Sequence, residues 1–221
     1  MMERNRPDPN SSLRERMIQD QLIARGIRDD AVLRAMRRIA REKFVPGALS
    51  MHAYDDCPLE IGCGQTISQP YIAAFMTELL SLRPEDSVLE IGTGCGYQTA
   101  LLAELAGSVE TIERIRTLYE GSRLRLSRLG YTNILCHFGD AQSDLLKRGG
   151  FDKIIVTAVA PEIPEILVDQ LNEGGQLVIP VGAPGGRQNL RIGTKINGIF
   201  QTAESIAVRF VPLLRGCEEE A

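Results

Sequence analysis

VLEIGTGCGY, residues 88–97, is the stretch that decides the expected fold. Apolar, β-prone residues surround Glu90, and a helix-forming run follows from residue 98 to residue 106. Between them, Gly92, Gly94 and Gly96 recur at every second position. Such glycines let the backbone turn sharply and let a ligand approach where a Cβ atom would collide, while the start of the helix leaves amide donors free. The stretch therefore predicts a strand, a glycine turn and a helix that together bind a ligand.

The spacing of these glycines narrows the choice of ligand. It is G-x-G-x-G, whereas a dinucleotide site has G-x-G-x-x-G, so recognition of a pyrophosphate is not favoured. With an acid two residues before the first glycine, the loop is similar to motif I of the class I S-adenosylmethionine-dependent methyltransferases. Glycine-rich turns also occur for packing alone, and the loop by itself leaves that alternative open.

The remainder of the chain from Pro84 onward alternates between strand and helix patterns, which predicts a doubly wound α/β fold with a largely parallel sheet. The expected strands are Ser87–Ile91, Val109–Ile112, Ile134–Phe138, Lys153–Ala158 and Gln176–Pro180. Two further β-prone runs flank Asn197-Gly198, a dipeptide typical of a type I′ hairpin. We expect this hairpin, followed by a strand over Ala207–Leu214, to add antiparallel strands at one edge of the sheet.

The N-terminal part precedes every expected strand of the sheet. Residues up to about Asn10 are polar and proline-rich, and we expect them to be disordered. A capping box at 12–15 predicts a helix that Gly26 ends, and a second helix is expected from Asp30 to Arg41. These helices would cover a site. We expect one domain, with a helical and active-site part (1–83), a cofactor-binding core (84–183) and C-terminal strands (184–221).

Acidic residues stand at the carboxyl ends of three expected strands. They are Glu90, Glu113 and Asp140, and ligands of open α/β sheets bind at those ends, so the three side chains should converge. Glu113 follows Gly92 by 21 residues, close to the offset of an acid that holds a ribose diol. Asp140 is expected to accept a hydrogen bond from adenine, and Glu90 to lie near the methionyl part. Their neighbours Arg114 and Ala141 are expected to contact the same ligand.

Composition and charge exclude several classes of function. The formal net charge is −4, so basic residues are not in excess over acidic ones. This disfavours a nucleic-acid partner, because phosphate contacts need clustered cations. The five cysteines and two histidines have neither a C-x-x-C pair nor a zinc spacing, so no metal site is expected. The sequence has no run as long as a membrane span and no apolar core of a signal peptide, so we expect a cytoplasmic protein.

Several blocks of sequence together resemble the protein-L-isoaspartate (D-aspartate) O-methyltransferase family. They span about three quarters of the chain in the family's order, and GQTISQP and VTAVAPEIP are specific to this family. The blocks are FVP at 44–46, AYDD-x-PLEIG-x-GQTISQP at 53–70, VLEIGTGCGYQTALLA at 88–103, TIERI at 111–115, FDKIIVTAVAPEIP at 151–164, GGQLVIPVG at 174–182 and VRFVPL at 208–213.

The resemblance implies an enzyme that takes a methyl group from S-adenosyl-L-methionine and leaves S-adenosyl-L-homocysteine. The acceptor would be the free α-carboxylate of L-isoaspartyl residues, and sometimes of D-aspartyl residues, in damaged proteins and peptides, so that methylation begins their repair. The family's catalytic serine corresponds to Ser68, which from spacing alone indicates only a helix cap or a residue next to one. Gln65, Thr66, Ile67 and Ser68 would contact both cofactor and acceptor, and the hydroxyls of Thr66 and Ser68 would hold the acceptor carboxylate.

How the acceptor peptide binds follows less directly from the sequence. Main-chain pairing of an extended peptide along VRFVPL, at Val211, is one mode. Three other functions remain as alternatives: a class I methyltransferase for a small molecule or RNA, a nicotinamide-dependent oxidoreductase, and a non-catalytic cofactor-binding protein. The spacing of the glycines disfavours the second, and intact Ser68, Glu90, Glu113 and Asp140 disfavour the third. We expect a monomer.

Overall fold

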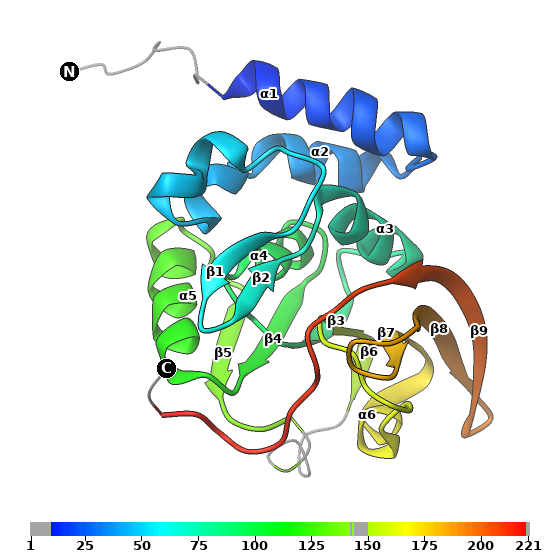
Figure 1. Ribbon diagram of the computed structural model, residues 1–221. Coiled ribbons are helices and arrows are strands. Elements are labelled where there is room, and N and C mark those ends of the chain that lie inside the picture. Colours follow the sequence, from blue (N-terminus) through cyan, green and yellow to red (C-terminus); the bar gives the residue numbers. More distant parts are fainter. Residues whose placement is uncertain (1–9, 142, 144–149, 220–221) are drawn as a thin grey trace.

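A seven-stranded sheet with helices packed against it forms the centre of the computed structural model, which describes residues 10–141, 143 and 150–219 (Figure 1). The expected disorder before Asn10 concerns residues that lie outside these ranges. The strand order is β5-β4-β3-β6-β7-β8-β9, in which β3 to β7 are parallel and the last two strands antiparallel. The predicted doubly wound α/β fold is confirmed.

Most strands lie where the sequence predicts them, and their bounds are β3 Ser87–Ile91, β4 Ser108–Glu113, β5 Ile134–Phe138, β6 Phe151–Val156, β7 Leu171–Gly182, β8 Gln188–Ile196 and β9 Ile199–Val208. Asn197 and Gly198 both have positive φ, 51° and 74°, as the predicted type I′ turn requires. The further strand predicted over Ala207–Leu214 is wrong, because β9 ends at Val208. Beyond it, Pro212 has no N–H to donate to a ladder, and the segment makes only an isolated bridge to Val159.

Both faces of the central strands are buried, and their residues alternate between two apolar clusters. In β6, Ile154 and Val156 belong to one cluster while Ile155 belongs to the other. In β3, Leu89 and Val88 divide in the same way. Side chains of successive strand residues point to opposite faces, so this alternation is the expected pattern of a parallel strand covered on both sides.

Helices α4 Tyr97–Ala103 and α5 Arg116–Arg128 follow β3 and β4, and the short α6 Glu165–Asp169 follows β6. The N-terminal part comprises α1 Ser11–Arg16, η1 Met17–Leu22, η2 Ile23–Arg25, α2 Asp30–Arg38, η3 Arg41–Phe44, η4 Gly47–His52, β1 Leu59–Gly62, β2 Gln65–Ile67 and α3 Pro70–Leu80. Its first helices lie above the sheet in Figure 1, where they pack on α3 and α4. Among the described residues, no helix is long and apolar enough to cross a membrane.

The first helix departs from its prediction at its start but not at its end. The predicted capping box is wrong, because α1 begins at Ser11 after Asn10 and no side chain caps it. Gly26, with φ of 98°, ends the helical segment in the left-handed conformation, as predicted. The N-terminal cover is thus present, although no capping side chain marks its start.

Candidate functional site

A cavity with about 920 Å³ of empty space lies at the carboxyl ends of β3, β4 and β6. Most of the residues predicted from the sequence line it: Gln65, Thr66, Ile67, Ser68, Gly92, Gly94, Glu113, Arg114, Asp140, Ala141 and Val211. Segments that are far apart in the sequence therefore meet in one place, as predicted.

The glycine turn has the backbone that only glycine adopts easily. Gly92, Gly94 and Gly96 have φ of 92°, 55° and 87°. A Cβ atom on Gly92 would lie 2.4 Å from Oγ1 of Thr157, and one on Gly96 would lie 3.2 Å from Leu126. Gly96 does not itself line the cavity; it precedes α4 and lets that helix pack against α5. The turn is therefore shaped by close packing below it as well as by the cavity above it.

Glu113 ends β4 beside this turn and is 5% exposed. Its Oε2 accepts a hydrogen bond from the N–H of Gly94 at 2.8 Å, and its Oε1 accepts one from the N–H of Ile115 at 3.0 Å. Burial raises the pKa of Glu113, and these backbone donors act in the opposite direction. The carboxylate thus fixes the glycine turn while it lines the cavity.

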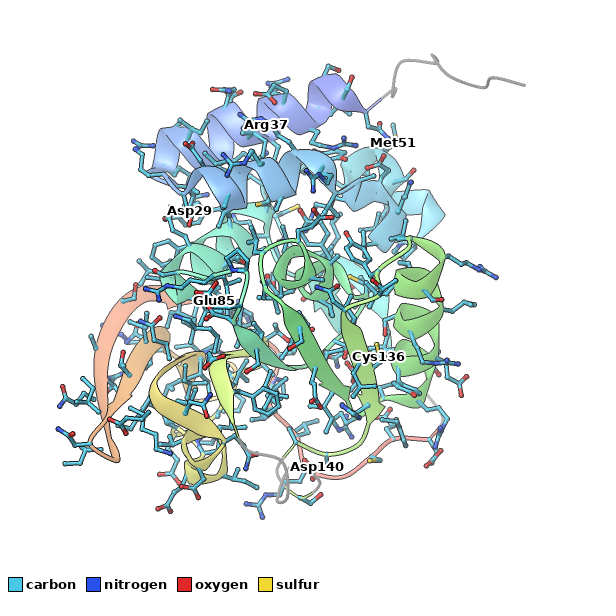
Figure 2. The ribbon with its side chains drawn as sticks, turned by 180° about the vertical axis from the view of Figure 1, so that it is seen from behind. Asp29, Arg37, Met51, Glu85, Cys136 and Asp140 are labelled. Atoms are coloured by element: carbon cyan, nitrogen blue, oxygen red, sulfur yellow. The ribbon has the colours of Figure 1, made fainter. Side chains whose placement is uncertain are left out.

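Asp140 lies at the same edge of the sheet, next to the C-terminal segment, residues 211–219 (Figure 2). Its Oδ2 accepts a hydrogen bond from the N–H of Gly216 at 2.8 Å. Arg114 donates to the carbonyl oxygen of Gly216 and forms an ion pair with Glu218. In Figure 1 this segment, in red, runs from β9 across to the foot of α5. The sequence did not indicate that the C-terminal segment would close this side of the cavity.

Glu90 differs from its predicted position. It is fully buried and does not line the cavity. Its Oε2 accepts hydrogen bonds from the hydroxyls of Thr99, at 2.5 Å, and Thr111, at 2.7 Å. Its Oε1 has no hydrogen-bond partner among the described residues. The side chain thus joins α4 to β4 from behind the glycine turn, and burial raises its pKa to about 8.

We predict that Glu90 makes the stability of the fold depend on pH. A carboxyl whose pKa rises from 4.5 to about 8 on folding takes up a proton, so the free energy of unfolding falls as pH rises between these values. The slope for one proton is at most about 1.4 kcal/mol per pH unit. Glu90→Gln should remove this slope and gain stability relative to the wild type from pH 5 to pH 8. Urea unfolding of both proteins at several pH values measures the difference, and parallel curves would contradict the prediction.

Ser68 lies at the junction of the cavity with a neighbouring groove of about 1020 Å³. Thr66, Ser68, Thr157 and Val211 line both spaces. Ser68 directly precedes Gln69, which is the N-cap of α3, so it lies next to the helix cap. Among the described residues no hydrogen bond engages the hydroxyls of Thr66 or Ser68. Both hydroxyls are therefore available to a ligand at this junction.

Sequence reasoning missed several residues of the site. Thr157 donates to the carbonyl oxygens of Ile91 and Gly92, at 3.0 and 2.7 Å, and so joins β6 to the glycine turn. Its place in the VTAVAPEIP block was the signal that indicated it. Tyr97 and Leu213 also line the cavity. No group of three metal-ligating side chains occurs in the described ranges.

Comparison with known proteins gives one family. The sequence model of the family described as Protein-L-isoaspartate(D-aspartate) O-methyltransferase (PCMT) matches residues 12–218. A protein-L-isoaspartate O-methyltransferase of Methylorubrum extorquens is 50% identical over 214 residues, which are 96% of this chain and 93% of that protein. One of Methanoculleus marisnigri is 50% identical over 207 residues and covers 94% of either chain.

Solved structures agree with the sequence comparison. A protein-L-isoaspartate O-methyltransferase matches with a TM-score of 0.80 and 28% identity, over 90% of this chain and 65% of that one. A Plasmodium falciparum structure named as a putative protein-L-isoaspartate O-methyltransferase, in complex with S-adenosyl-L-homocysteine, matches with a TM-score of 0.79 and 31% identity. It covers 94% of this chain and 99% of the other, so the fold is shared nearly from end to end.

Proposed function

Because this chain belongs to the protein-L-isoaspartate (D-aspartate) O-methyltransferase family, we propose that it methylates the free α-carboxylate of L-isoaspartyl residues in damaged proteins and peptides. The methyl donor is S-adenosyl-L-methionine, whose product is bound in the related Plasmodium structure. The observation that carries the proposal is the junction at Thr66 and Ser68, where the cofactor cavity meets a second groove. Methyl transfer needs two ligands to meet in this manner, one from either space.

The cofactor cavity offers S-adenosyl-L-methionine the carboxylates of Glu113 and Asp140 as hydrogen-bond acceptors. A Cβ on Gly92 would lie 2.4 Å from Oγ1 of Thr157, and one on Gly94 would lie 3.3 Å from Ile61 of the β1–β2 hairpin, so the turn has no room for larger residues. We assign the contacts to Gln65–Ser68, the glycine turn, Glu113, Arg114, Asp140 and Ala141. Glu90 contributes from behind the turn, through Thr99 and Thr111.

Methyl transfer to a carboxylate does not require the protein to act as a general base. When bound, S-adenosyl-L-methionine supplies an electrophilic methyl group. A peptide α-carboxylate has a pKa near ~3.5 and is ionised at neutral pH, so no general base is needed to form the nucleophile. Alignment of reacting groups is worth roughly 7–11 kcal/mol at its upper range. We assign this task to Ser68, which donates a hydrogen bond to the acceptor carboxylate without forming a covalent bond, with Thr66 as the second donor.

The acceptor groove runs from Pro58 and Ile72 to residues 207–211. Gln188 is 2% exposed, and its side-chain amide holds both backbone groups of Phe210. Oε1 accepts from the N–H of Phe210 at 2.6 Å, and Nε2 donates to its carbonyl oxygen at 3.3 Å. The amide thereby continues the ladder beyond the last residue of β9 and keeps the chain extended. This supports pairing of an extended acceptor peptide along the segment that contains Val211.

Replacing the amide of Gln188 should weaken binding of the acceptor. Gln188→Leu leaves the N–H of Phe210 without its partner and loosens the edge of the groove, so we expect KM for an isoaspartyl peptide to rise by roughly 5–20-fold, which is the effect of about 1–2 kcal/mol. The Kd of S-adenosylhomocysteine should change by less than about twofold, since Gln188 does not line that cavity. If KM for the peptide and Kd of S-adenosylhomocysteine rise by the same factor, the substitution has disrupted the fold in general rather than the groove.

Methyl transfer to two peptides tests the function directly. The peptides differ only in carrying isoaspartate or aspartate at one position, and the methyl donor is labelled. Base-labile methylation of the isoaspartyl peptide alone is the expected result. If neither peptide is methylated although the protein binds S-adenosylhomocysteine, the proposed acceptor is wrong and the assignment of the cofactor stands. A third peptide with D-aspartate measures the second activity of the family.

Assembly and location form the remaining part of the proposal. We propose that the protein acts as a monomer in the cytoplasm, as one methyltransferase domain, on proteins rather than nucleic acids. The net charge of −4 supports the last point. Gel filtration with light scattering tests the first, and a mass of about 24 kDa is expected because the chain is 24.3 kDa.

A further inference from the structure

A buried arginine connects the N-terminal cover to the proposed catalytic serine. Arg41 begins η3 and has 0% exposed surface. Its Nε donates to the carbonyl oxygen of Ala53 at 2.7 Å, and its Nη2 donates to the carbonyl oxygen of Ser68 at 2.7 Å. One side chain therefore holds two points of the long active-site loop that lie 15 residues apart in the sequence.

The same guanidinium contacts the cofactor side of the site. Its carbon lies 4.7 Å from the centre of the ring of Tyr97. Tyr97 is the first residue of α4, follows the glycine turn and lines the cofactor cavity. Phe44, from the same short helix as Arg41, packs edge-on against this ring at 5.4 Å. Arg41 and Phe44 together thus hold the N-terminal cover, Ser68 and the start of α4 in fixed positions relative to one another.

Stability alone gives no evident reason for a cation at this position. Within the described part of the chain, Nε and Nη2 of the guanidinium donate to carbonyl oxygens, Nη1 has no hydrogen-bond partner, and the group faces an aromatic ring rather than a carboxylate. Burial of a charge without an opposite charge is costly, and an apolar side chain of similar volume would fill the space at less cost. The planar fork of arginine, however, reaches two carbonyl groups at a defined separation, which lysine or methionine cannot do.

We propose that Arg41 is a positioning residue for methyl transfer, which sets the backbone of Ser68 so that its hydroxyl meets the acceptor carboxylate at the junction of the two spaces. The inference rests on the proposed role of Ser68. It assigns Arg41 no contact with either ligand, since Arg41 lines neither space. Displacement of a catalytic group by about 1 Å can cost roughly 100-fold in rate, so loss of this support should appear in kcat.

A double-mutant cycle distinguishes this role from general support of the fold. Arg41→Met should lower kcat by roughly 10–100-fold while the Kd of S-adenosylhomocysteine changes by less than about threefold. In a Ser68→Ala background the same replacement should cost less than about threefold, because the hydroxyl that it misplaces is absent. Arg41→Lys should recover part of the rate. An equal factor in both backgrounds would overturn the proposal.

Two control variants separate positioning from loss of stability. Leu22→Ala removes a fully buried apolar side chain of the cover, which cannot form a hydrogen bond with Ser68, and it should lower the melting temperature with little effect on kcat. Arg38→Met removes an arginine whose ion pair with Glu104 is at the surface, and it should resemble the wild type. If Leu22→Ala lowers kcat as much as Arg41→Met does, the proposal is overturned.

Hydrogen exchange provides a measure that does not depend on activity. Amides of residues 65–69 should exchange at least about tenfold faster in Arg41→Met than in Arg38→Met, because the segment loses its support. Unchanged exchange would overturn the inference even for an active enzyme. If the wild type fails to methylate the isoaspartyl peptide while the exchange result holds, the proposed acceptor is wrong and the support of Ser68 by Arg41 remains.

Discussion

We expect Ser68→Ala to lower kcat for an isoaspartyl peptide by roughly 10–100-fold, the effect of losing about 1.5–3 kcal/mol for a hydrogen bond to a charged group. The hydroxyl is available at the junction of the cofactor cavity and the acceptor groove. The backbone of Ser68 stays held by Arg41, since that bond involves its carbonyl oxygen. The Kd of S-adenosylhomocysteine should therefore change by less than about threefold. Initial rates and calorimetric titration measure the two quantities.

The matched control for this variant is Ser108→Ala. Ser108 is exposed at the first residue of β4, whereas the site lies at the carboxyl ends of the strands, so its loss should leave kcat unchanged. An unchanged kcat for Ser68→Ala, or a methylated serine recovered by mass spectrometry, would contradict the role of Ser68 as a positioning donor. Thr66→Val extends the series to the second hydroxyl of the junction.

Gly92→Ala should cost both stability and cofactor affinity. With φ of 92°, an alanine here adopts an unfavourable left-handed backbone, and its Cβ meets Oγ1 of Thr157 at 2.4 Å. Thr157 is β-branched and donates to two carbonyl oxygens of this turn, so it cannot move without losing those bonds. We expect a loss of roughly 2–4 kcal/mol in the free energy of unfolding and at least about tenfold in the Kd of S-adenosylhomocysteine.

Gly121→Ala is the same substitution at a position where, unlike at Gly92, we expect no loss of stability or of cofactor affinity. Gly121 lies within α5, and no atom within 4 Å would meet its new Cβ. Alanine is the better helix former by roughly 0.5–1 kcal/mol, so this variant should be slightly more stable and bind the cofactor as the wild type does. Thermal unfolding of both variants with and without S-adenosylhomocysteine tests the pair. A Gly92→Ala protein that the ligand stabilises as fully as the wild type would contradict the prediction.

The positions of the parallel strands and the glycine turn were predictable because local patterns determine them. Apolar runs separated by helical periods specify a parallel sheet, and the glycines stand where φ must be positive. The carboxyl ends of the strands then bring Glu113 and Asp140 to one edge. These rules account for Gly92, Gly94, Glu113 and Asp140 in the lining of the cavity. Residues 65–68 were instead expected from the resemblance to the family, and Glu90 and Gly96 do not line the cavity.

Other features depend on contacts between distant residues and so leave no local pattern. Glu90 precedes the turn in the sequence, yet strand alternation directs its side chain behind the turn, to Thr99 and Thr111. Arg41 reads as one more cation of an amphipathic helix, and only the folded loop shows that it reaches Ser68. The helical periodicity of the N-terminal part likewise gave no sign that α1 begins without a capping side chain.

The C-terminal segment has a consequence for the timing of the catalytic cycle. It lies over one side of the cofactor cavity through Leu213 and Leu214, and Asp140 and Arg114 hold it there. Its ion pairs with Arg114 and Arg116 lie at or near the surface, where salt screens them. We expect release of S-adenosylhomocysteine from this side of the cavity to require these ion pairs to break. We therefore expect its residence time to shorten with ionic strength, and turnover to quicken wherever that departure limits the rate.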